Sequence, residues 1–174
     1  MKVEYAQLTK LPQNAISLFC LLGAERISLP YTAFATKYGL KDVNAVVVSE
    51  LYEVISRGRV IDLTRIYQAI YDGIPDTEDY SDELADQAQC SAICTSYCVS
   101  YFLTGDFESV QNSLSKVEDA IDVADVDVEQ RIDADVLWSN KLISILQSSD
   151  FHNGSFIAQI RQENLKAAVQ TVNS

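Results

Sequence analysis

Residues 73–124 read GIPDTEDYSDELADQAQCSAICTSYCVSYFLTGDFESVQNSLSKVEDAIDVA, and this stretch decides the fold class. Pro75 and the acidic turn after it, residues 76–79, end any preceding helix. They also supply side-chain oxygens that cap a new one, with Ser81 or Asp82 as the expected N-cap. Small and apolar residues then recur at spacings of three and four, which predicts a long helix after this turn.

Gly105 divides the stretch in two. Glycine readily adopts the left-handed conformation that closes a helix, so the first helix is expected to end there. Asp106 can cap a second helix, whose apolar stripe at helical period extends from Phe107 to Ala124. A connection this short makes the two helices antiparallel neighbours. The stretch therefore predicts an antiparallel helical hairpin.

Proline, aspartate and glycine mark the beginnings and ends of helices in the rest of the chain as well. We expect further helices from Pro12 to Ile27, from Pro30 to Tyr38, between Asp42 and Gly58, from Asp62 to Tyr71, from Asp127 to Gln147 and over about 154–170. The β-branched run 46–48 would also suit a strand, but the segment is too long for an ordinary strand. The prediction is an all-α fold, a bundle of about seven or eight helices with the hairpin at its centre.

Length and composition fit one globular domain. The chain has 174 residues, 48% of them hydrophobic and 22% charged, which indicates a single domain over 1–174 with its core over about 8–147. The longest nearly apolar run, residues 15–24, is too short to span a bilayer. The first residues lack the pattern of a secretory signal. We expect a cytoplasmic protein with no membrane partner.

The negative charge is concentrated in the middle of the chain. The formal net charge is −12, and residues 72–135 carry 17 acidic and 2 basic residues. The negative electrostatic field of this segment repels nucleic acid and anionic membranes and favours basic proteins as partners. The alternative is that the acidic residues only keep the protein in solution.

One group of carboxylates within this acidic segment has helical spacing. Its members are Glu118, Asp122, Asp125, Glu129 and Asp133, spaced four, three, four and four. If one helix continued through them, they would share a face and destabilise it by a few tenths of a kcal/mol per pair. Arg131, a basic partner or divalent cations could offset that cost, and a solvated helix face explains the spacing equally well.

Cysteine and histidine do not assemble into a recognisable site. Cys90, Cys94 and Cys98 fall at i, i+4 and i+8 on one helix, so the outer pair would lie about 12 Å apart along the axis, too far for one zinc ion. They are expected to be core residues, with a partly exposed reactive thiol as the alternative. The single histidine, His152, lies in a predicted loop without a nucleophile beside it. No metal and no cofactor is expected.

Glu25 and Arg26 are charged residues at the end of an apolar helix. Adjacent helical residues do not face each other. We therefore expect Arg26, near the helix C-terminus, to pair with a carboxylate elsewhere in the chain.

The order of several motifs resembles a known family. They are Glu25-Arg26, Pro30-Tyr31 with Phe34, Asp42 before a long helix, Pro75 to Asp79, and Leu103 to Asp106. Together they are similar, over about residues 8–147, to the bacterial YjaG-like family, domain of unknown function number 416. The resemblance implies a compact all-helical cytoplasmic protein, monomeric or dimeric, without an established activity. It makes Glu25, Arg26, Asp76 and Asp79 candidate family-motif residues.

Three functional hypotheses follow. The first is a binding or regulatory protein without a catalytic centre, whose acidic face engages a basic protein or which pairs with a second copy of itself. An immunity-type inhibitor of a basic toxin is a special case, in which electrostatic steering would speed association. The third hypothesis is of a different class, an enzyme that uses Asp76 and Asp79 with a divalent metal.

Overall fold

The structure, a computed structural model, describes residues 2–80, 82–124, 126–148 and 154–172, with side chains up to residue 168. Its elements are α1 (Tyr5–Leu8), α2 (Gln13–Arg26), α3 (Leu29–Tyr38), α4 (Val43–Arg57), α5 (Leu63–Asp72), the short 3-10 helix η1 (Thr77–Asp79), α6 (Glu83–Thr104), α7 (Phe107–Val123), α8 (Val128–Ser148) and α9 (Gly154–Val172). No strand occurs in these ranges. The predicted all-α class is confirmed. The sequence did not predict α1 and η1, so the described helices outnumber the seven or eight expected.

Aspartate side chains begin four of the helices, as predicted. The carboxylates of Asp42, Asp62, Asp82 and Asp106 accept hydrogen bonds of 2.9, 3.0, 3.2 and 3.1 Å from backbone N–H groups in the first turns of α4, α5, α6 and α7. Each bond satisfies a donor that has no partner within the helix. The alternative N-cap, Ser81, lies outside the described residues.

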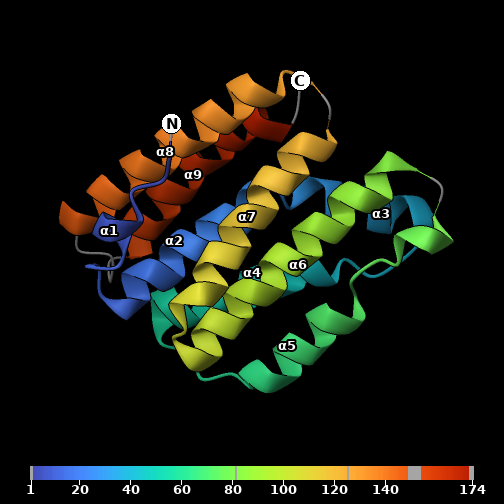
Figure 1. Ribbon diagram of the computed structural model, residues 1–174. Coiled ribbons are helices and arrows are strands. Elements are labelled where there is room, and N and C mark those ends of the chain that lie inside the picture. The colour runs from blue at the N-terminus through green and yellow to red at the C-terminus, as the bar shows by residue number, and fades with distance from the viewer. Residues whose placement is uncertain (1, 81, 125, 149–153, 173–174) are drawn as a thin grey trace.

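The α6–α7 hairpin is confirmed. Gly105, at φ +69°, ends α6 in the left-handed conformation, and its N–H donates to the carbonyl of Tyr101 at 2.8 Å. The two helices then lie antiparallel and side by side (Figure 1). Buried polar contacts also cross between them, since the hydroxyl of Ser113 donates to the carbonyl of Cys94 at 3.3 Å.

The most enclosed element is α2. Every residue from Ala15 to Arg26 is buried, and α2 packs against α4, α6, α7, α8 and α9 (Figure 1). A helix that is apolar on nearly all sides is an interior helix, and the charged pair at its end is therefore buried with it.

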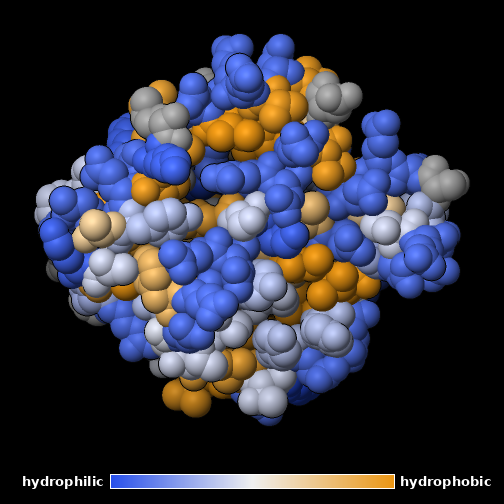
Figure 2. Space-filling view, in the orientation of Figure 1, coloured by the Kyte–Doolittle hydropathy of each residue, from blue (hydrophilic) through white to orange (hydrophobic). Residues whose placement is uncertain are grey.

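The remaining helices surround this centre. On one side α8 and α9 lie next to each other, and both contact α2 and α7. On the other, α3 and α5 pack against α6. None of the described helices combines the length and the apolar composition needed to cross a bilayer. Hydrophilic residues occupy much of the face in Figure 2, with smaller hydrophobic patches among them.

Candidate functional site

The predicted array of carboxylates lies on two helices instead of one. Because α7 ends at Val123 and α8 begins at Val128, Glu118 and Asp122 belong to α7, and Glu129 and Asp133 to α8. The fifth member, Asp125, lies outside the described residues. The four described side chains are all exposed. A single continuous helical face is therefore absent, but two acidic pairs occur on helices that pack together. We call these four residues the acidic face.

The electrostatic environment of the acidic face is negative. Partial burial and the negative charge of Asp135 on α8 raise the pKa of Glu118, so this carboxylate lies toward α8. The acidic segment has two basic residues, Lys116 and Arg131. Lys116 pairs with Asp119 at 2.5 Å on α7, and Arg131 is only 4% exposed.

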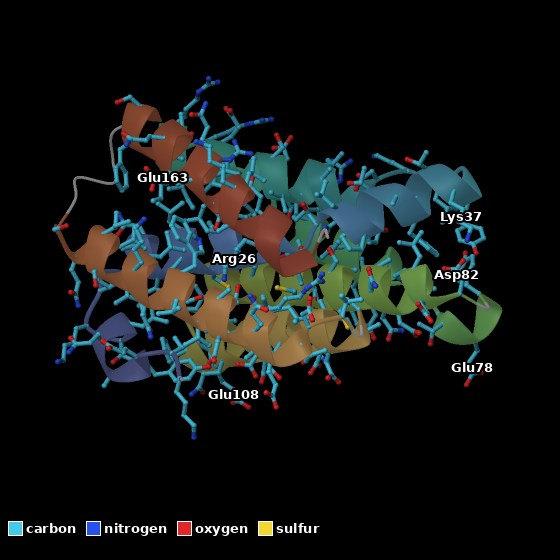
Figure 3. All side chains as sticks on the ribbon, turned by 90° about the horizontal axis from the view of Figure 1, so that it is seen from above. Arg26, Lys37, Glu78, Asp82, Glu108 and Glu163 are labelled. Atoms are coloured by element: carbon cyan, nitrogen blue, oxygen red, sulfur yellow. The ribbon has the colours of Figure 1, made fainter. Side chains whose placement is uncertain are left out.

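Arg26 is fully buried and pairs with a distant carboxylate, as expected. Its Nε donates to Oδ1 of Asp135 at 2.8 Å, its Nη2 to the hydroxyl of Ser139 at 3.1 Å, and its Nη1 to Oδ1 of Asn164 at 3.2 Å. Asn164 also donates to the carbonyl of Leu22 at 2.9 Å. Figure 3 shows Arg26 in the interior of the molecule. This buried network ties α2 to α8 and α9.

Glu25 is held on the other side of α2. Its carboxylate accepts hydrogen bonds from the Tyr52 hydroxyl at 2.7 Å and from Nη2 of Arg161 at 2.6 Å. The guanidinium of Arg161 lies over the Tyr52 ring, 3.8 Å from its centroid, a favourable stacking of cation on aromatic face. Burial and the charge of Glu25 raise the pKa of Tyr52 well above its ordinary value. Glu25 therefore connects α2 to α4 and α9.

Both charged residues of α2 are thus saturated with protein partners and lie away from solvent. Arg26 is 1% and Glu25 5% exposed, so their visible role is to join helices. The sequence did not identify Asp135 or Asn164 as partners of Arg26. A usable signal for Asn164 was its position among Ile157, Ile160 and Ala168, a helical stripe in which an amide is the exception.

Asp76 and Asp79, the other two candidate family-motif residues, lie beside a hollow of about 430 Å³ between α3 and η1. Tyr31, Phe34 and Tyr80 form the aromatic part of its lining. Oδ1 of Asp76 accepts a hydrogen bond from the N–H of Glu78 at 3.1 Å and so begins η1. Asp79 is exposed.

A polar cluster stands next to this hollow. Asp82 accepts hydrogen bonds from Nζ of Lys37, at 2.7 Å, and from the hydroxyl of Tyr38. These two donors lower the pKa of Asp82 to about 2. Figure 3 shows Lys37 and Asp82 together at one end of the molecule, with Glu78 at the same end. The cluster joins the end of α3 to the beginning of α6.

Within the described ranges, no three or more His, Cys, Asp or Glu side chains are grouped so that they could hold a metal ion. The cysteines of α6 are core residues, as expected. Cys90, Cys94 and Cys98 are buried, as is Cys20 on α2, and burial raises the pKa of the three α6 thiols. A partly exposed reactive thiol was the wrong alternative. His152 lies outside the described residues.

The structure resembles one solved protein over nearly its whole length. The crystal structure of a DUF416 family protein from Shewanella baltica OS155 superposes with a TM-score of 0.82 at 13% sequence identity, covering 99% of this chain and 98% of that one. The fold expected from the family resemblance is therefore confirmed. No protein-family model and no curated protein matches the sequence.

Proposed function

We propose that this chain is a non-catalytic binding or regulatory protein whose acidic face engages a basic protein. The observation that supports the proposal is the exposure of Glu118, Asp122, Glu129 and Asp133 on two adjacent helices while the segment's two bases are paired or buried. Exposed charges of one sign attract a partner of the opposite sign and speed encounter.

Exposed apolar side chains lie next to the acidic face in the sequence. On α8, Leu137 follows Glu129 and Asp133 at the same spacing of four and is 55% exposed. Val126, in the connection before α8, is also exposed. Interfaces combine an apolar contact with a polar rim. A basic protein with an apolar residue among its Lys and Arg side chains fits this surface best.

Capture from nuclease-treated cell lysate tests the proposal, with the immobilised chain washed first at low and then at high salt. We expect one basic protein to be retained in stoichiometric amount and released by salt, because exposed charge pairs are screened. A double variant, Asp122→Lys with Glu129→Lys, should lose it.

The matched control is Glu108→Lys with Glu78→Lys, which makes the same change in net charge at two exposed carboxylates outside the acidic face. Equal loss of the captured protein from both double variants would show attraction by net charge alone. Retention by the Asp122→Lys, Glu129→Lys variant would exclude the acidic face as the binding surface.

A further inference from the structure

A second hollow, of about 570 Å³, lies where the beginning of α2 meets the ends of α4 and α6. It contains no member of the acidic face. Its polar lining includes Gln13, Ser17 and Ser56, and its apolar lining includes Val54, Ile55 and Phe102. Small-molecule sites combine apolar walls with converging polar groups, as this hollow does, and its volume lies in their usual range.

Ser17 gives this hollow a polar group without a partner. Ser17 lines the hollow and is only 5% exposed. No described residue forms a hydrogen bond with its hydroxyl, which is not one of the fully enclosed polar atoms that lack a partner. The hydroxyl therefore stays accessible from the hollow. A hydroxyl left over in the lining of a hollow is therefore available to a ligand.

Most of the enclosed hydroxyls of the interior, in contrast, have protein partners. Ser91 accepts from Nδ2 of Asn44 at 3.0 Å, and Ser139 accepts from Arg26. Ser113 donates to the carbonyl of Cys94. Thr95 also lacks a partner, but it does not line this hollow.

The remaining chemistry of the hollow is neutral. None of its described lining residues is charged, although 22% of the chain is. The backbone at this point offers both donors and acceptors, because α2 begins there without a side-chain cap while α4 and α6 end there. The partial positive charge at the beginning of α2 offsets part of the negative charge at the ends of α4 and α6.

We propose that this hollow binds a small uncharged molecule with a flat apolar body and a hydrogen-bonding edge, such as an aromatic amide. The edge bonds the Ser17 hydroxyl and the Gln13 amide. The flat body lies between Phe102 and the aliphatic side chains of α4.

The test uses four small probes and the full chain, labelled with ¹⁵N. Benzamide and 2-pyridone are uncharged, and benzoate and benzylamine place opposite charges on a similar ring. We expect benzamide or 2-pyridone to give saturable shifts of backbone amides near residues 13–17 and 54–58. The charged probes should bind there at least tenfold more weakly. Absence of a saturable shift at these residues with both uncharged probes would overturn the proposal, as would equal binding of the charged ones.

Variants separate the site from a general effect. Ser17→Ala should weaken the binding of the uncharged probe by about two- to tenfold, the effect of one hydrogen bond, and Gln13→Ala by a similar factor. Ser144→Ala is the control, since it removes an exposed hydroxyl that donates to the Asn140 carbonyl on α8, and should leave the affinity unchanged. Thermal melting verifies that all three variants fold. Unchanged affinity in Ser17→Ala and Gln13→Ala would refute the assignment.

Discussion

The guanidinium of Arg26 on α2 and the carboxylate of Asp135 on α8 form an ion pair of 2.8 Å that is almost completely removed from solvent. The two residues are 109 positions apart in sequence. Desolvation of two charges is costly, and their attraction offsets it only when the remaining polar atoms are also satisfied. Ser139 and Asn164 bond the other guanidinium nitrogens. The pair therefore fixes the position of α8 against α2.

Removal of one partner from this pair should be strongly destabilising. Asp135→Ala leaves a buried guanidinium without its counter-ion, and we expect it to lower the free energy of unfolding by about 3 to 5 kcal/mol, measured by urea denaturation. Glu53→Ala is the control, because it breaks the exposed pair with Arg57 on α4 and should cost less than about 1 kcal/mol. The double variant Arg26→Met with Asp135→Leu should recover part of the loss. Similar small losses in Asp135→Ala and Glu53→Ala would contradict this account.

Asn164 should anchor α9. Its Oδ1 accepts from both Arg26 and Nε1 of Trp138, and its amide donates to Leu22. Asn164→Ala leaves these buried groups unsatisfied, each at a cost of about 1 to 3 kcal/mol, so we expect a loss above 1 kcal/mol and a shift in the fluorescence of the single tryptophan. Asn140→Ala, at an exposed hydrogen-bonding amide of α8, should do neither. An unshifted emission spectrum in Asn164→Ala would disprove the anchoring role.

Tyr52 should make the protein sensitive to alkali. Its pKa in the folded chain is raised above the ordinary value of 10.0 by burial and by Glu25, so the folded state keeps a proton that the unfolded state loses. The stabilisation is complete below about pH 10 and declines as the pH rises from there toward the folded pKa. Tyr52→Phe removes this proton, so its stability difference from the wild type should shrink above pH 10. Parallel stability curves from pH 8 to 11 would contradict the prediction.

Asp82 should make the stability of the protein depend on pH in the acidic range. Hydrogen bonds from Lys37 and Tyr38 lower its pKa from 3.8 to about 2, so its contribution is present above the unfolded value and is lost as the pH falls toward 2. Asp82→Asn keeps an N-cap side chain but removes the charge. The variant should melt at a lower temperature than the wild type at pH 6, and the two melting temperatures should converge below pH 3. A constant difference between pH 6 and pH 2.5 would be the opposite result.

Local chemistry is what the sequence predicted best. The aspartates that begin α4 to α7 and the glycines that end α3, α4 and α6 act through bonds within a few residues. Such signals do not depend on the rest of the fold. The hairpin followed from Gly105 and Asp106 for the same reason.

The partners of buried charges could not be predicted in this way. Arg26 was expected to find a carboxylate, but nothing local distinguishes Asp135 from the other acids, since the choice depends on how α8 packs. The helical spacing of the carboxylates would give one shared face only if a single helix continued through them, and the connection between Val123 and Val128 separates two helices. The accessible hydroxyl of Ser17 depends on how α2 packs against α4 and α6 and has no sequence signal.

The salt dependence of association with the captured basic protein tests the central proposal most directly. Asp122→Lys and Glu108→Lys change the net charge equally on one helix, at exposed sites 14 residues or about 21 Å apart. We predict that Asp122→Lys lowers the association rate constant by at least tenfold at low salt and flattens its salt dependence, while Glu108→Lys changes it by less than about twofold. Equal rates for the two variants, or no captured partner, would contradict the assignment of the acidic face as a binding surface.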